Sequence, residues 1–148
     1  MAGRINPYEW KDLTLFFSLP RTFFIENDCI SKIVCIFAAK KTIETMKQTI
    51  LNRIKQSLAT TLPRRSKAML YGSQARGDAR ADSDWDILIV LDKERLLPSD
   101  YDTITYPLTK LGWELGAEIN PIMYTKKEWE ANRITPFYHN VLEDAIAL

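Results

Sequence analysis

The chain has 148 residues, a length typical of one domain, and its 46% hydrophobic and 26% charged content is ordinary for a globular protein. Its formal net charge is only +1, from 20 basic and 19 acidic residues, so it lacks the basic excess of a dedicated nucleic-acid binder, and nucleic acid is not expected as a direct substrate. No apolar run reaches the roughly 18 residues that span a bilayer, which argues against a membrane protein, and two cysteines are too few for a disulfide framework, which favours a cytoplasmic protein.

The first part of the chain, residues 1–45, has no regular pattern. Prolines interrupt two aromatic-rich stretches, and neither stretch has a period of 2 or 3.6. We therefore interpret residues 1–45 as an N-terminal extension and residues 46–148 as the folded domain. Met46 stands where the pattern becomes regular, which suggests the hypothesis that the natural chain starts there. A peptide from residues 1–40, found in the native protein by mass spectrometry, would refute it.

The helical signal improves from Lys41 onward. Hydrophobic residues recur there at three- or four-residue steps, which predicts an amphipathic helix that ends before Pro63. The apolar run at residues 68–71 predicts a buried strand, which Gly72 ends. Residues 84–91 predict a second strand, and a loop rich in Gly, Ser, Asp and Arg joins the two.

The last third of the chain predicts more alternation of helices and strands. Residues 99–115 indicate a helix that Pro107 kinks or starts, because proline lacks the N–H for a helical hydrogen bond. Residues 118–124 indicate a third strand. The run 125–128, Thr-Lys-Lys-Glu, has the capping-box form that opens a helix. A threonine–proline pair then opens a last helix over residues 136–144.

Two aspartates, Asp84 and Asp86, open the second predicted strand. Residues i and i+2 of a strand point to the same face. Two carboxylates about 5–6 Å apart repel by roughly 3 kcal/mol at an effective dielectric constant near 20. Mg²⁺ would offset that repulsion, because it prefers carboxylate and phosphate oxygens. Two such ions about 3.5–4 Å apart could clamp the attacking and leaving oxygens of a phosphoryl displacement.

The turn before the aspartates has features of a phosphate site. Gly72 lets the backbone approach a ligand closely, and Ser73 offers a hydroxyl where a helix could begin. Arg76 adds a planar guanidinium that suits phosphate oxygens. A Gly-Ser pair alone is usually an ordinary turn. Its position between a buried strand and an aspartate pair favours the phosphate site.

The run from Tyr71 to Val90 resembles the signature of the minimal nucleotidyltransferases of the polymerase-β superfamily. That signature is a hydrophobic residue, Gly-Ser, a spacer, and then Asp-hydrophobic-Asp-hydrophobic. The resemblance covers residues 46–148. It implies an α/β (α+β) fold in which helices flank a small mixed β-sheet.

The resemblance also implies roles for the residues of the motif. Gly72 and Ser73 would hold the phosphates of an NTP, and Arg76 would help to neutralise them. Asp84 and Asp86 would bind Mg²⁺, in all two ions, and would be catalytic residues.

The family uses a third carboxylate, on a later strand, to activate the attacking hydroxyl. Asn120 is the closest positional match in this chain, and an amide cannot act as a base. Glu118 lies two residues earlier on the same strand face, so we take it as the candidate third catalytic acid. Whether the site turns over depends on this strand.

By this resemblance the chain is expected to transfer a nucleoside monophosphate, AMP from ATP, to a hydroxyl group with release of pyrophosphate. Minimal nucleotidyltransferases are frequent partners of HEPN proteins. The resemblance therefore implies an antitoxin role, in which a tyrosine or other hydroxyl of a HEPN toxin is modified, in a homo- or hetero-oligomer.

Two alternatives stay open at this point. One is a nucleotidyltransferase that acts on a small molecule such as an aminoglycoside. The other is a non-catalytic antitoxin module that binds a nucleotide or a partner, and the amide at Asn120 favours it.

Overall fold

The computed structural model describes residues 28–148. The chain divides into two compact units, residues 1–42 and residues 43–148. Within residues 28–148, the first helix crosses the boundary between the units, and all strands and the other helices belong to the second unit, which carries the candidate site. Among the described residues, no helix is both long enough and apolar enough to cross a membrane.

Helix α1, Asp28–Thr61, begins well before Lys41, where the sequence predicted its start. The earlier turns gave no periodic signal because apolar side chains occupy successive positions from residue 33 to residue 39. The helix ends before Pro63, as predicted. Of the proposed N-terminal extension, residues 1–27 lie outside the described residues.

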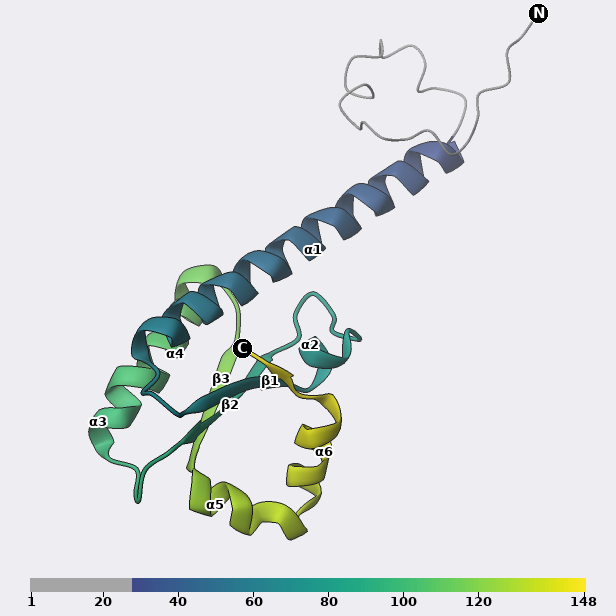
Figure 1. Ribbon diagram of the computed structural model, residues 1–148. Coiled ribbons are helices and arrows are strands. Elements are labelled where there is room, and N and C mark those ends of the chain that lie inside the picture. Colours follow the sequence, from purple (N-terminus) through teal and green to yellow (C-terminus); the bar gives the residue numbers. More distant parts are fainter. Residues whose placement is uncertain (1–27) are drawn as a thin grey trace, which may run out of the picture. The chain divides into compact units, whose positions relative to one another are not determined.

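Four strands form a mixed sheet in the order β3-β2-β1-β4. Their bounds are β1 Lys67–Tyr71, β2 Trp85–Leu91, β3 Ile119–Thr125 and β4 Ile146–Ala147. β1 runs antiparallel to β2 and β4, whereas β3 runs parallel to β2 (Figure 1). The mixed sheet and its flanking helices confirm the predicted fold class. The short β4 was not predicted, because two residues are too few to show a period.

The remaining helices are short. They are α2 Ser73–Arg76, α3 Pro98–Asp100, α4 Tyr106–Leu115, α5 Lys126–Ala131 and α6 Pro136–Asp144, with a π-helical turn at Tyr101–Thr105 and a 3₁₀ turn at Asn132–Ile134. The helix predicted over residues 99–115 is thus divided. Pro107 lies in the first turn of α4, and the wider π turn precedes it, because proline cannot donate to the preceding turn.

Threonines cap the last two helices, as predicted. Thr125 Oγ1 accepts a hydrogen bond from Glu128 N at 3.2 Å, and Glu128 Oε2 accepts one from Thr125 N at 2.8 Å. Thr135 Oγ1 accepts one from Tyr138 N at 3.2 Å, and Pro136 follows it as the first residue of α6. These caps satisfy N–H groups that the start of a helix leaves without partners.

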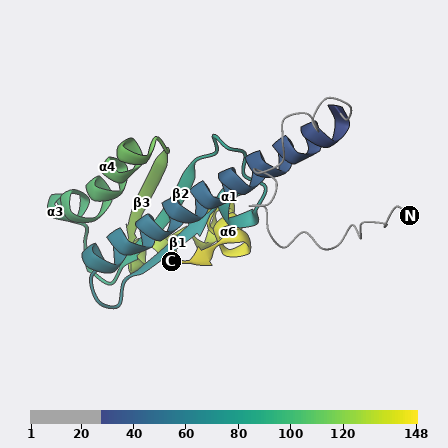
Figure 2. The same ribbon diagram turned by 90° about the horizontal axis from the view of Figure 1, so that it is seen from above.

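Strand β2 separates two hydrophobic cores, because alternate residues of a strand point to opposite faces. Ile87 and Ile89 face the core that α1 and α4 cover, and Figure 2 shows α1 crossing that side of the strands. Leu88 and Val90 face the core under α5 and α6. Buried aromatic side chains, chiefly those of Trp129 and Tyr138, fill the space that the ribbons of the sheet, α5 and α6 enclose in Figure 1.

Candidate active site

The two aspartates lie at the start of β2, on the face that α5 and α6 cover. Asp84 directly precedes the strand and Asp86 is its second residue, and both side chains are half-buried. In the sheet register Asp86 stands opposite Tyr71 of β1 and opposite Asn120 of β3. The two aspartates therefore lie at one end of an inner strand of the sheet. On one side is β1, which leads into the glycine turn, and on the other is β3, which carries Asn120.

The glycine turn lies directly against the second aspartate. Gly72 has φ 76° and ψ −156°, a backbone conformation that side chains strongly disfavour. A Cβ atom at this position would lie 2.8 Å from Asp86 Oδ2. Ser73 follows as the first residue of α2 and is half-buried. Glycine is thus needed at residue 72 both for its backbone conformation and for the close approach to the carboxylate.

The amide of Asn120 lies beside the aspartate pair. Its Nδ2 donates a hydrogen bond to Asp84 Oδ2 at 3.3 Å. Burial raises the pKa of Asp86 above its ordinary value, repulsion from Asp84 raises it further, and the Asn120 amide lowers it. The single amide therefore relieves only part of the repulsion between the two carboxylates.

Glu118, the candidate third acid, lies just before β3. Its backbone carbonyl accepts a hydrogen bond from Trp85 N at 2.8 Å, which fixes the start of the β2–β3 pairing. Its carboxylate is exposed, and within the part of the chain that the structure describes it forms neither a hydrogen bond nor an ion pair. The structure thus brings Asn120 into contact with Asp84, whereas Glu118 lies at the rim of the site.

Hydrogen bonds also hold the loop that joins the glycine turn to the aspartates, and the sequence did not predict them. Gln74 Nε2, from α2, donates to Ser83 O at 2.9 Å, directly before the first aspartate. Lys47 Nζ, from α1, donates to Ala79 O at 2.7 Å. Arg80 N donates to Ser83 Oγ at 2.9 Å. The contacts of Gln74 and Lys47 leave no local pattern in the sequence, because both depend on the path of the loop in three dimensions.

Arg76, predicted to neutralise phosphates, is engaged by two carboxylates. Its Nη1 lies 2.6 Å from Asp144 Oδ2, at the end of α6, and its Nε lies 3.2 Å from Asp78 Oδ2. The Arg76 side chain is 45% exposed, so it is accessible to a ligand while it links the glycine turn to the last helix.

Tyr71 forms the apolar side of the site. Its ring contacts Phe137 edge-to-face, with 5.6 Å between ring centroids. Burial, with the negative charge of Asp86 and the proximity of Tyr124, raises the pKa of Tyr71 to about 12. The phenol therefore stays protonated at neutral pH and cannot serve as a base there.

The aspartate pair suits a magnesium ion whose coordination a nucleotide completes. Mg²⁺ usually binds proteins through one or two carboxylates together with substrate phosphates. Asp84 and Asp86 supply two carboxylates on one face, and Gly72 leaves room beside them. Burial, and then repulsion from Asp84, raise the pKa of Asp86, and a cation would relieve the repulsion. Residues 28–148 contain no group of three or more His, Cys, Asp or Glu side chains that could hold a metal ion, so the two aspartates would bind Mg²⁺ together with water or phosphate oxygens.

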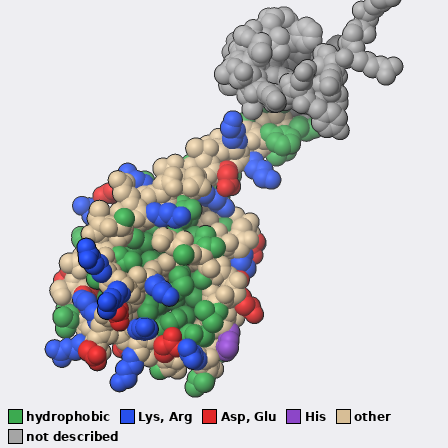
Figure 3. All heavy atoms as spheres, in the orientation of Figure 1, with side chains coloured by type: hydrophobic (Ala, Val, Ile, Leu, Met, Phe, Trp, Pro, Cys, Tyr) green, Lys and Arg blue, Asp and Glu red, His purple; other side chains and the backbone are tan. Residues whose placement is uncertain are grey.

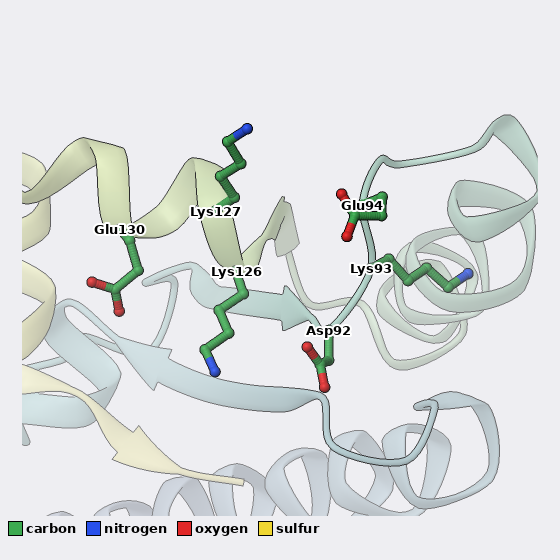
Figure 4. Close-up of a pocket in the computed structure, with 6 residues that line it drawn as sticks. All are labelled: Asp92, Lys93, Glu94, Lys126, Lys127 and Glu130. Atoms are coloured by element: carbon green, nitrogen blue, oxygen red, sulfur yellow. The ribbon is translucent and has the colours of Figure 1, made fainter.

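A hollow of about 530 Å³ lies at the other end of β2, and acidic and basic side chains line it. These side chains do not converge on one point where a ligand could bind. Lys93 forms an ion pair with Asp100. Figure 4 shows Lys126 and Lys127 pointing in different directions, and Lys93 reaching away from both. On the face seen in Figure 3, basic and acidic side chains lie intermixed. We therefore interpret this end of the sheet as a charged surface exposed to solvent.

Comparison with known proteins identifies the family of this chain. Residues 51–144 match the nucleotidyltransferase domain family. A protein of Methanocaldococcus jannaschii that carries the name of protein adenylyltransferase is 33% identical over 111 residues, which cover 75% of this chain and 94% of that protein.

Two solved structures match parts of this chain, each at 20% sequence identity. The first is a toxin–antitoxin with AMP-PNP, with a TM-score of 0.47 over 65% of this chain and 69% of that chain. The second is a protein from Sulfolobus solfataricus described as a nucleotidyltransferase, with a TM-score of 0.43 over 74% of this chain and 84% of that chain. Because the family match spans most of the second unit and the archaeal relative is similar over three quarters of the sequence, this chain belongs to the nucleotidyltransferase family of enzymes.

Proposed function

We propose that this enzyme transfers AMP from ATP to a hydroxyl group of a protein, with Mg²⁺, and releases pyrophosphate. The observation that carries the proposal is the close approach of Gly72 to Asp86, which sets a phosphate-type turn against a carboxylate pair. The name of the Methanocaldococcus relative supports adenylyl transfer and a protein acceptor.

The proposed roles are those that the resemblance to minimal nucleotidyltransferases implies. Gly72 and Ser73 hold the phosphates of ATP, and Arg76 contributes positive charge to them. Asp84 and Asp86 hold Mg²⁺, which when bound neutralises charge on the phosphates and on the leaving pyrophosphate.

The reaction forms a bond between the acceptor oxygen and the α-phosphorus and breaks the bond from that phosphorus to the oxygen that leaves with pyrophosphate. The proton of the acceptor hydroxyl passes to Glu118, the candidate base, or to water. Catalysis is mainly positioning and charge stabilisation, since the proposed displacement is direct and forms no covalent bond to the enzyme.

The amide at residue 120 favours an acceptor that ionises easily. A phenol has a pKa of about 10, so it needs a weaker base than an aliphatic hydroxyl does. We therefore propose a tyrosine as the acceptor. The resemblance to minimal nucleotidyltransferases supports a HEPN protein as the partner and an antitoxin role for the modification.

A second candidate function is a non-catalytic module that neutralises its partner by contact. The hydrogen bond between Asn120 and Asp84 favours it, because an amide occupies the place nearest the metal pair on β3.

Incubation with labelled ATP, Mg²⁺ and a co-expressed HEPN protein separates these functions. We expect wild type to label the partner, and the double variant Asp84→Ala plus Asp86→Ala to label nothing. Asp92→Ala, which removes an exposed aspartate at the other end of β2, is the matched control and should label normally. No label from wild type, with neutralisation of the partner surviving in the double variant, would refute the enzymatic function and support the binding module.

A further inference from the structure

A groove of about 440 Å³ adjoins the candidate site, between α4 and the start of β3. It is lined chiefly by Gly112, Trp113, Gly116, Ala117, Glu118 and Asn120. The groove depends on glycine at residue 112, where a Cβ atom would lie 2.6 Å from Ala117 O and 3.3 Å from Ile119 Cγ1. Its form is therefore set by the tight packing of α4 on β3.

The groove lies on the side of the site from which an acceptor has to approach. In an in-line displacement the attacking oxygen lies opposite the leaving pyrophosphate. Gly72 reaches Asp86 from the β1 side of β2, which is where the proposed function puts the phosphates. Asn120 reaches the pair from the β3 side, and it is also a wall of the groove. An acceptor lying in the groove would thus enter the site from the side opposite the phosphates.

The lining of the groove favours a polypeptide over an aminoglycoside. Trp113 is 71% exposed, and its ring contacts the 55% exposed Tyr106 edge-to-face, with 6.5 Å between centroids. Exposed tryptophan and tyrosine side chains are typical anchors of protein recognition. Glu118 is the one charged side chain among the residues that line the groove. A polycationic small molecule would call for several carboxylates, whereas an apolar side chain of a peptide needs an aromatic surface such as Trp113.

We propose that this groove binds an extended polypeptide segment that carries the acceptor hydroxyl. An apolar or aromatic side chain of the segment packs on Trp113, and the hydroxyl residue next to it passes over Asn120 toward Asp84. The inference rests on the proposed adenylyl transfer and names the class of substrate and the surface that selects it.

The test uses an array of random 15-residue peptides, each with one tyrosine, serine or threonine, together with labelled ATP and Mg²⁺. We expect wild type to label peptides that share a large apolar residue at a fixed separation from the labelled hydroxyl. Trp113→Ala should lower that labelling at least tenfold, and Trp113→Phe should restore most of it. Tyr101→Ala removes another exposed aromatic side chain, one outside the groove, and should label as wild type does.

Binding of Mg²⁺ and AMP-PNP, measured by calorimetry, separates this inference from the proposed function. Wild type and Trp113→Ala should bind the analogue equally, because the substitution leaves Gly72, Asp84 and Asp86 in place. Equal peptide labelling by the two proteins would overturn the inference, and so would binding of the analogue without any labelled peptide. A wild type that fails to bind the analogue would instead refute the proposed function itself.

Discussion

The side-chain amide of Asn120 donates a hydrogen bond to Asp84, with 3.3 Å between Nδ2 and Oδ2. A carboxylate in the same place would add a third negative charge to a pair that is already repulsive. The amide therefore lowers the repulsion in the protein without nucleotide, and it leaves the site with fewer charges for a cation. We therefore expect the site to be more stable without metal, and to bind a cation more weakly, than a site with three carboxylates.

Introducing a carboxylate at residue 120 should strengthen metal binding. We expect Asn120→Asp to tighten Mg²⁺ binding in the presence of AMP-PNP about tenfold or more, because a negative charge at this distance from the cation attracts it strongly. The same change should lower the melting temperature without metal. Titration calorimetry and thermal unfolding measure the two effects. Asn140→Asp, which adds the charge on an exposed position of α6, is the control, and equal Mg²⁺ affinity in both variants would contradict the prediction.

A side chain at Gly72 should damage both stability and binding. Gly72→Ala forces a Cβ atom to 2.8 Å from Asp86 Oδ2 at a positive φ, so we expect a loss of about 1–3 kcal/mol and at least a tenfold weaker affinity for AMP-PNP. Gly77→Ala is the matched control. It has φ 82° but meets no atom within 4 Å, so it should cost about 1–2 kcal/mol and leave binding unchanged. Unfolding in urea and calorimetry give both quantities, and the same binding loss in both variants would argue against the contact.

Removing the charge of Asp86 should stabilise the protein while it destroys the site. Burial and the neighbouring Asp84 disfavour the ionised form, as the raised pKa of Asp86 indicates. We expect Asp86→Asn to raise the melting temperature at neutral pH without metal by on the order of 2 °C, and to abolish Mg²⁺-dependent binding of AMP-PNP. Differential scanning calorimetry tests the first part. A lower melting temperature would show that the carboxylate is stabilising as it stands.

The buried Asp100 should make part of the folding stability depend on pH. The side-chain hydrogen bond from Lys93 holds the pKa of Asp100 below its ordinary value of 3.8, and the N–H of Leu97, 2.9 Å from Oδ2, lowers it further. A lowered folded pKa gives stability that is present above the unfolded pKa and is lost as the pH falls through the folded pKa.

We therefore expect Asp100→Asn to lose about 1–3 kcal/mol at pH 7, where a hydrogen-bonded charge is removed, and the difference from wild type to shrink below pH 3.8. Urea unfolding at a series of pH values measures it. Asp102→Asn, at an exposed position, should show no such dependence. A difference that stays constant down to pH 3 would mean that the Asp100 charge is not responsible.

The sequence predicted those parts of the fold that depend on local rules. The capping residues Thr125 and Thr135 place the starts of α5 and α6 correctly, and runs of apolar residues place the first three strands. The choice between Glu118 and Asn120 was beyond local rules, because both residues share one strand face. The sheet register, which pairs Asp86 with Asn120, decides which of them contacts the aspartates. The roles of all these site residues stay predictions until they are measured.

Contacts between distant segments were also beyond the sequence. Arg76 has the chemistry of a phosphate ligand, and only the fold shows that Asp144, at the end of the last helix, competes for it. The tether from Gln74 to Ser83 likewise depends on how the loop closes.

The aspartates extend from a strand that has neighbours on both edges and hydrophobic cores on both faces. Amide protons in such a strand exchange with solvent only when the whole domain unfolds, because no smaller opening exposes them. Residues 87–90 of β2 should therefore be among the slowest to take up deuterium. The carboxylates cannot separate while that strand persists, so the ability to bind a metal nucleotide should be lost on heating together with the fold, in one transition.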